Sequence, residues 1–454
     1  MKRGKLIISA LAGALVLLAG ASTWAQDTEP FYFWRWGHMD GPHDSSKALG
    51  ISRDGKTAVG STVVVDFTRA WRSDIDWAIA TDDGVPPLYN ELQVQEDIGM
   101  IEPSRPSAAF ASSDMITSPV GYDLPNLSLD WGGSRPVGTI AGGKKLSFGI
   151  EWLLPVLDSV DDGDFVKVPD FGGGAADMAV KDVTVDGGII VGYGNNKRGP
   201  LAFYADMTVL DSEDLPILKP LTITDSVYTE QTLKWTVAEA VSADGTMIAG
   251  YGGTKTGNRA WFATVVDATT DPITLLSVVL PNLSGGKFNE AYAMTPDGAI
   301  IAGRCDSPRG PQACIWFVDP ATAEWSVKGL GGLSKKKLDS VATGIAYKPA
   351  SDAGELMVVG YSKSILYDSE AFVWTGNPVL EDDGIGYFYD LEYILTKTGA
   401  GELSGFGSQW ILNEATGVSD DGTRIVGWGV NPEGGIEAWV VTGYPFDTPV
   451  FTHE

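Results

Sequence analysis

A motif that recurs along most of the chain constrains its fold more than any other feature. In a clear copy, an apolar segment ends in Asp-Gly at 240–245, a second segment ends in Gly at 247–250, and an Ala-aromatic segment follows at 260–262. A motif that returns every several tens of residues indicates stacked or radially arranged structural units. Six clear copies lie near 48–71, 179–204, 238–262, 291–317, 342–374 and 415–441, and a degenerate copy lies near 135–152.

Each copy is typical of short antiparallel strands. Asp-Gly favours a tight hairpin in which both central residues take positive φ. The β-branched and aromatic segments favour strands, and the Gly that ends the second segment leaves room for a close neighbour. A less patterned fourth strand, such as 326–330, completes the unit, and no helical periodicity of useful length follows the N-terminal segment. The sequence therefore predicts an all-β chain folded as a β-propeller of seven blades, each with about four antiparallel strands.

The segment 31–36, Phe-Tyr-Phe-Trp-Arg-Trp, precedes the first copy and has no repeat of its own. Pairing it with the last copy would close the ring and cover an exposed sheet edge. The alternative is an ordinary leading strand within the first blade. We expect a propeller closed by this N-terminal strand.

The N-terminus has the pattern of an export signal. Three basic residues precede an apolar run at 6–18, and small residues then lead to Ala25. The apolar run is too short to favour a membrane-spanning helix. We expect residues 1–25 to be a cleaved signal peptide and residues 26–454 to form one propeller domain. That domain is expected to be secreted or periplasmic, monomeric, and not inserted in a membrane.

The copies resemble the HAF family of extracellular repeats, found in exported bacterial proteins. The resemblance rests on the Ala-x-x-Val-Ser-x-Asp-Gly-x-x-Ile-Val-Gly cores, the Ala-Phe/Trp-x-Trp strands, and the stretches at 330–333, 390–395 and 413–419. It covers roughly residues 45–442, with 72–134 matching poorly. The resemblance implies a propeller-like exported protein and supplies no established reaction.

Charge restricts the class of partner. The formal net charge of −27 argues against nucleic acid as a ligand, because phosphates would be repelled. The predicted loops between the second and third strands of the copies differ in charge from the rest of the chain, because they hold ten basic and only six acidic residues. These loops are 61–69, 139–147, 193–200, 251–259, 304–312, 361–370 and 428–437. Their basic residues are Arg69, Lys144, Lys145, Lys197, Arg198, Lys255, Arg259, Arg304, Arg309 and Lys363.

On a closed ring these residues would converge into a basic rim that attracts an anionic polysaccharide or an acidic protein surface. The alternative is that exposed hairpin tips accept Lys and Arg, which discourage pairing between sheet edges. We name the ten basic residues as candidate ligand-binding residues.

Cys305 and Cys314, the only cysteines, flank one predicted hairpin. In an oxidising compartment they would form a structural disulfide, and a free thiol pair or a soft-metal site is the alternative.

We expect no metal and no cofactor, although three polar clusters contain groups that can bind metal ions. The segment 38–44 contains His38, His43 and two aspartates, which could bind a divalent ion or form a solvated loop. The acidic stretches 161–164 and 381–384 could hold Ca²⁺ or be surface turns.

These observations favour an exported, non-enzymatic binding or scaffold propeller. The alternative is a glycoside hydrolase or polysaccharide lyase that uses carboxylates at the propeller face. The irregular segments 72–134 and 376–412 would then form the cleft walls, with Trp77, Trp131 and Trp410 stacking on sugars unless these rings are buried. The sequence names no catalytic residue.

Overall fold

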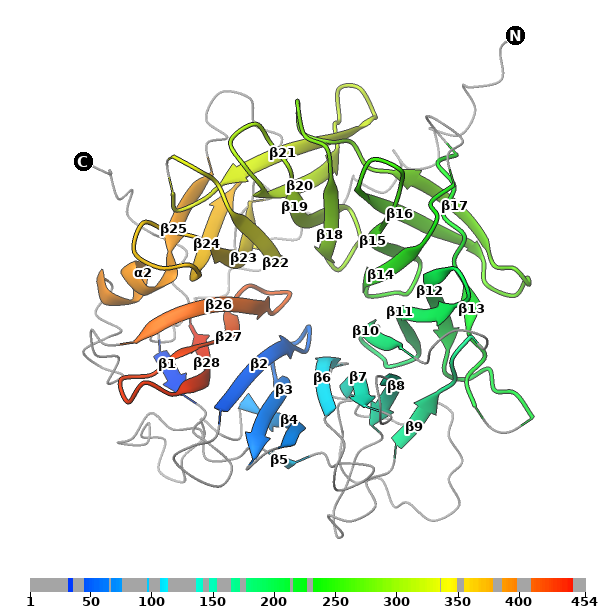
Figure 1. Ribbon diagram of the computed structural model, residues 1–454, viewed down its shortest axis with the longest axis horizontal. Helices are drawn as coiled ribbons and strands as arrows, with labels where there is room; N and C mark the ends of the chain where they lie inside the picture. The colour runs from blue at the N-terminus through cyan, green and yellow to red at the C-terminus, as the bar shows by residue number, and fades with distance from the viewer. Residues whose placement is uncertain are drawn as a thin grey trace, which may run out of the picture.

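The computed structural model describes residues 32–35, 45–64, 67–75, 96–97, 107–112, 136–141, 147–152, 165–171, 177–212, 215–226, 232–334, 336–348, 355–378, 386–397 and 410–443. In this part of the chain the strands form seven four-stranded antiparallel sheets. The sheets surround a common axis, with one strand of each nearest the centre (Figure 1). The predicted β-propeller class is confirmed.

Every sheet runs from an inner strand near the axis to an outer strand. From inside to outside, the β2 sheet has β2 (Ser45–Ile51), β3 (Thr57–Val64), β4 (Phe67–Asp74) and β5 (Glu96–Asp97). The β6 sheet has β6 (Ser107–Ser112), β7 (Pro136–Ala141), β8 (Ser147–Trp152) and β9 (Phe165–Val168). The β10 sheet has β10 (Ala179–Val183), β11 (Ile189–Asn196), β12 (Gly199–Asp206) and β13 (Lys219–Pro220). The β14 sheet has β14 (Thr236–Val241), β15 (Met247–Gly253), β16 (Asn258–Asp267) and β17 (Thr274–Val279).

The other three sheets follow the same order. The β18 sheet has β18 (Asn289–Met294), β19 (Ile300–Cys305), β20 (Gln312–Val318) and β21 (Trp325–Gly331). The β22 sheet has β22 (Ser340–Tyr347), β23 (Leu356–Ser362), β24 (Glu370–Gly376) and β25 (Tyr387–Asp390). The β26 sheet has β26 (Ile411–Val418), β27 (Arg424–Val430), β28 (Ile436–Thr442) and β1 (Tyr32–Arg35).

The ring closes as the sequence predicts. The N-terminal strand β1 pairs antiparallel with β28, from Tyr32 opposite Thr442 to Arg35 opposite Trp439. The buried Phe33 ring lies 5.2 Å from Trp410 in an edge-to-face arrangement. The first strand of the chain is therefore the outer strand of the last sheet.

The degenerate copy also forms a sheet. Strands β7 and β8 fall on the worn motif at 135–152, and their inner strand β6 comes from the poorly matched segment 72–134. A short helix, α2 (Leu391–Lys397), connects β25 to β26. Its seven residues are too few to show a helical period, so this helix is compatible with the lack of helical periodicity in the sequence.

The Asp-Gly turns differ from the predicted two-residue hairpins. Gly55 has φ +74°, whereas Asp54 does not take positive φ. The Asp54 carboxylate instead accepts hydrogen bonds from the Ser52 hydroxyl at 2.6 Å and from the Lys56 N–H at 3.0 Å. The Ser52 oxygen accepts from the Thr57 N–H at 2.9 Å. A Ser/Thr-x-Asp-Gly turn held by side chains therefore replaces the turn with two positive-φ residues.

The Gly that ends each second strand is required by the backbone opposite it. In β14 the register shifts between Ala238 and Ala240, which is a β-bulge. A Cβ on Gly250 would lie 2.0 Å from the Val237 carbonyl oxygen, too close for any side chain. Equivalent glycines with the same 2.0 Å contact are Gly60, Gly192, Gly303, Gly360 and Gly427. The Gly that follows Val or Ala at the end of each of these second strands thus indicates a bulged inner strand.

Large aromatic side chains fill the space between sheets. The largest fully buried side chains are Trp71, Trp261, Trp316, Trp374 and Trp439, all in third strands. The predicted disulfide is confirmed: Cys305 and Cys314 are bonded, with Cα atoms 5.9 Å apart, and both are buried in the core between the β14 and β18 sheets.

Candidate functional site

The two ends of the propeller carry different turns. Because neighbouring strands run antiparallel, the turns between first and second strands lie at one end and those between second and third strands at the other. We call these the Asp-Gly end and the rim end. The rim turns are shorter than predicted: β11 ends at Asn196 and β12 begins at Gly199. The predicted loop 193–200 is therefore mostly strand.

Four of the predicted rim residues are exposed at the tips of these turns. Lys197 and Arg198 form the turn between β11 and β12, and Lys255 lies in the turn between β15 and β16. Arg309 is exposed in the turn between β19 and β20. These four residues come from three consecutive sheets at one end of the molecule.

Three other predicted rim residues make internal contacts. The Arg304 guanidinium pairs with Asp339 at 3.0 Å, and Lys363 pairs with Asp368. Arg259 donates a hydrogen bond to the Leu280 carbonyl at 3.0 Å, and burial lowers the pKa of this guanidinium. The ion pairs reduce the charge that Arg304 and Lys363 offer to a ligand, and Arg259 is partly buried against a backbone carbonyl.

The last three predicted rim residues fall outside what the structure describes. Arg69 lies on β4, but its side chain is not among the described parts, and Lys144 and Lys145 lie in an undescribed segment. A continuous basic rim around the ring stays a prediction.

An exposed apolar tip lies at the same end. In the turn between β23 and β24, the side chains of Ile365 and Leu366 are 87% and 80% exposed, and Tyr367 is 40% exposed. The Ser364 hydroxyl accepts hydrogen bonds from the N–H groups of Leu366 and Tyr367, at 3.0 and 3.1 Å. The Ser364 N–H donates to the Tyr367 carbonyl at 3.0 Å. Three hydrogen bonds therefore close the turn while its apolar side chains face solvent.

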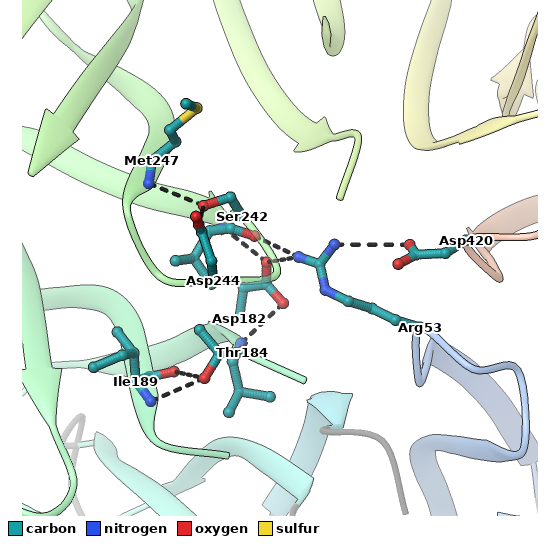
Figure 2. A network of polar contacts seen from close by, with 10 residues as sticks. Arg53, Asp182, Thr184, Ile189, Ser242, Asp244, Met247 and Asp420 are labelled. Carbon is teal, nitrogen blue, oxygen red and sulfur yellow. Dashed lines mark hydrogen bonds and ion pairs between the residues drawn. The ribbon is translucent and has the colours of Figure 1, made fainter. Parts of the chain in front are cut away.

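An arginine links distant sheets at the Asp-Gly end. Arg53, in the turn between β2 and β3, donates to the Val241 carbonyl and lies 3.6 Å from an Asp182 oxygen. Its other terminal nitrogen lies 3.7 Å from Asp420. Figure 2 shows the side chain extending between these two carboxylates. Burial raises the pKa of Asp182, and the positive charge of Arg53 opposes that shift.

Aromatic residues form a belt between neighbouring sheets. The residue after the repeat glycine is Tyr193, Tyr251, Tyr361 or Trp428 in four of the sheets, and we call these four the inter-sheet belt. Each is half-buried. Desolvation and nearby carboxylates, Glu239 among them, raise the pKa of Tyr193 to about 12.

The belt contacts the inner strand of the following sheet. The Lys47 ammonium lies 3.5 Å from the centre of the Trp428 ring, and the Tyr251 and Tyr292 rings lie 5.9 Å apart, edge to face. The belt residue thus contacts a cation at one junction between sheets and an aromatic ring at another.

Two carboxyl groups with raised pKa values lie where β25 meets α2. Burial, together with the negative charge of Glu370, raises the pKa of Asp390 to about 6. Burial and the charges of Asp390 and Glu370 raise the pKa of Glu392 to about 7. Asp390 also accepts a hydrogen bond from the Glu392 N–H at 2.9 Å and so caps the helix.

The other features predicted from the sequence do not form a site among the described residues. Trp410 is buried against Phe33, so it cannot stack on a sugar, and Trp77 and Trp131 lie outside the described residues. His38, His43 and the acidic stretches 161–164 and 381–384 also lie outside the described residues. Within the described ranges, no group of three or more His, Cys, Asp or Glu side chains could hold a metal ion.

Sequence reasoning missed both the apolar tip and the inter-sheet belt. The tip is visible as Ile-Leu-Tyr-Asp between two serines at 364–369, an unusually apolar composition for a turn. The belt is visible as an aromatic residue directly after the repeat Gly. Both signals are local, and neither indicates which residues of other sheets lie nearby.

Comparisons with known proteins identify similar folds only. No protein family profile and no curated protein matches the chain. Among solved structures, Sqt1 of Chaetomium thermophilum bound to the N-terminus of ribosomal protein L10 is 11% identical, covers 88% of this chain and 84% of its own, and has a TM-score of 0.39. TolB from Acinetobacter baumannii is 12% identical, covers 85% and 80%, and has a TM-score of 0.35.

Prolyl oligopeptidase B from Galerina marginata is 12% identical, covers 90% of this chain and 50% of its own, and has a TM-score of 0.44. At these values the peptide bound by Sqt1 and the activity of the oligopeptidase are properties of those proteins alone. Among the described residues, no helix is long and apolar enough to cross a membrane.

Proposed function

We propose that this chain is an exported, non-enzymatic binding propeller that captures a protein partner at its rim end. The observation that carries the proposal is the exposed apolar tip of the turn between β23 and β24. Exposed side chains of this size are costly to leave in water, and a rigid turn loses little conformational entropy on binding. A partner with an apolar pocket would bury Ile365 and Leu366 together.

The charge at the rim end supports a protein partner with acidic surroundings. The tip is itself neutral, because Lys363 and Asp368 pair with each other. The exposed Lys197, Arg198 and Lys255 on other turns of this end would attract carboxylates around the pocket. An anionic polysaccharide offers such charges but no apolar pocket, so it is the less favoured partner.

Export is part of this proposal. It is supported by the basic and apolar pattern of the N-terminal residues, by the resemblance to HAF repeats, and by the disulfide between Cys305 and Cys314. Edman sequencing of protein recovered from the culture medium or periplasm tests it, and we expect a new N-terminus near position 26.

Site-specific photo-crosslinking tests the partner proposal. A benzophenone amino acid would replace Leu366, and in the control Val266, which is 63% exposed at the Asp-Gly end of β16. We expect one protein to be crosslinked from position 366 in the producing cells and not from 266. The purified partner should then bind wild type and Val266→Asp equally, and bind Leu366→Asp at least about tenfold more weakly.

Charge reversal separates the two parts of the interface. Lys197→Glu with Arg198→Glu should slow association and flatten its salt dependence, whereas Leu366→Asp should speed dissociation. Crosslinking to polysaccharide, or equal yields from positions 366 and 266, would overturn the proposal of a protein partner.

A further inference from the structure

The contact between Lys47 and Trp428 shows what one position of the inter-sheet belt binds. The Lys47 ammonium lies 3.5 Å from the Trp428 ring centre, and the Trp428 indole N–H donates to Glu414 at 3.1 Å. A cation over an aromatic face beside a carboxylate is a favourable arrangement for ammonium or guanidinium groups. At this position the chain supplies the cation from the inner strand of the next sheet.

The same repeat position carries the opposite charge between β15 and β18. Lys47 lies opposite Ser61, the residue after the glycine of β3. Glu290 lies opposite Arg304, the residue after the glycine of β19, so Glu290 and Lys47 are equivalent. The belt residue Tyr251 therefore faces a strand that bears a carboxylate and Tyr292, where Trp428 faces an ammonium.

Glu290 is held in place by two neutral hydrogen-bond donors. Its two oxygens accept hydrogen bonds from the Asn258 amide and the Tyr292 hydroxyl, both neutral donors. Among the described residues it makes no ion pair, and the neighbouring Arg304 pairs with Asp339 instead. The nearby Glu239 is already paired with Lys181 at 3.3 Å. Among the described contacts, the Glu290 carboxylate therefore lies beside two aromatic rings and is held by neutral donors.

The groups around Glu290 indicate a negative electrostatic potential between Tyr251 and Tyr292. The charges of Glu239 and Glu290 contribute to raising the pKa of Tyr251, after desolvation as the larger cause. Tyr251, Glu290 and Tyr292 are each half-buried, so they keep contact with solvent while being partly desolvated. Partial desolvation strengthens both ion pairing and cation–π attraction.

We propose that Tyr251, Glu290 and Tyr292 form a binding site for an ammonium or guanidinium group of a ligand, which supplies the positive charge that Lys47 supplies beside Trp428. We call these three residues the cation site. The group is carried either by a free amine or by a lysine or arginine side chain of a peptide. The proposal does not depend on the rim-end partner, and it adds a second binding chemistry to the molecule.

Titration with small probes tests the cation site. The charged probes are n-butylammonium and the blocked peptides acetyl-Gly-Lys-Gly-amide and acetyl-Gly-Arg-Gly-amide, and the neutral control is acetyl-Gly-Gln-Gly-amide. Binding of each probe is measured by NMR saturation transfer. We expect saturable binding of the charged probes only. A response to butylammonium alone would indicate a free amine as the ligand, and preference for the peptides would indicate a peptide side chain.

Glu290→Gln removes the charge and keeps the size of the side chain, with one oxygen that can accept from Asn258 or from Tyr292 and an NH2 group in place of the second oxygen. We expect it to weaken probe binding at least about tenfold. Glu433→Gln, in the exposed turn between β27 and β28, is the matched control and should bind as wild type does. Thermal unfolding of both variants establishes that the fold is retained.

Lys47→Met provides a gain of binding as an independent test. Removing this cation leaves Trp428 and Glu414 free to take an external one, so the number of bound probes should rise from one to two per chain. Equal binding by wild type and Glu290→Gln, or an unchanged number with Lys47→Met, would overturn the proposal. Neither result bears on crosslinking from position 366, so failures of the two proposals are distinguishable.

Discussion

Arg53 and Asp182 lie 3.6 Å apart although they belong to the β2 and β10 sheets, which are not neighbours in the ring. Arg53 also contacts Asp420 of the β26 sheet, and the backbone N–H of Asp420 donates back to the Arg53 carbonyl at 2.8 Å. One side chain thus connects sheets on both sides of its own. In a ring whose sheets otherwise pack against their neighbours, this contact adds a direct link across the axis.

We expect Arg53→Met to destabilise the chain by about 3 kcal/mol, because it leaves Asp182 buried without its cation. The Arg53 and Asp182 side chains are 13% and 21% exposed, so solvent screens the pair only partly. Chemical denaturation of Arg53→Met, Asp182→Asn and the double variant would measure the coupling. Lys56→Met, which removes an exposed pair with Asp54, is the control and should change stability by less than about 0.5 kcal/mol. Equal losses of unfolding free energy in Arg53→Met and Lys56→Met would contradict a special role for Arg53.

Gly250→Ala should destabilise the propeller by about 3 kcal/mol or more, since its Cβ would lie 2.0 Å from the Val237 carbonyl oxygen. The matched control is Gly435→Ala, where the nearest atom would be 3.4 Å away on the Asn431 side chain and φ is not positive. Urea unfolding monitored by tryptophan fluorescence measures both. A Gly250→Ala protein as stable as the control would show that the bulged strand can move aside.

The repeat was sufficient to predict the propeller because several of its residue types are required by the backbone and packing of each sheet. The Gly of each Val-Gly or Ala-Gly pair marks a bulge in the strand opposite it, and the aromatic residues of third strands, such as Trp261, fill the space between sheets. The turn at Ser52 was predicted with the wrong geometry, because the side-chain bonds of Asp54 substitute for a second positive φ. Strand β6 was missed because Ser107–Ser112 lacks the motif and is recruited by pairing with β7.

The candidate sites were less predictable, since they depend on contacts between copies. Counting basic residues located Lys197, Arg198 and Lys255 at the rim end, yet could not foresee that Asp339 neutralises Arg304. Asp339 precedes the next repeat, so no pattern within one copy indicates that pair.

The disulfide should contribute about 2 to 3 kcal/mol, as expected for a bridge between residues nine positions apart. We expect both cysteines to resist alkylation in the absence of reductant and Cys305→Ala with Cys314→Ala to lower the free energy of unfolding by that amount. Alkylation of either thiol in unreduced native or unfolded protein, followed by mass spectrometry, would contradict the bond.

Stability should fall with rising pH because of Asp390 and Glu392. Their pKa values in the folded chain, about 6 and about 7, lie above the usual values of 3.8 and 4.5. The folded state therefore binds more protons than the unfolded state between about pH 4 and pH 7, and the stability that these groups contribute is lost as pH rises through that window. Denaturation midpoints of wild type and of Asp390→Asn with Glu392→Gln, measured from pH 4.5 to pH 8, test this.

The comparison with the double variant isolates these two groups from the repulsion among the other carboxylates of a chain with net charge −27. Asparagine at 390 can still accept the hydrogen bond from the residue 392 N–H, so the cap of α2 is preserved. The two midpoints should therefore be similar near pH 4.5 and diverge above pH 6, with the variant the more stable. Parallel curves would show that Asp390 and Glu392 titrate in the folded chain as they do in the unfolded one, and that burial at the junction of β25 and α2 does not restrain their ionisation.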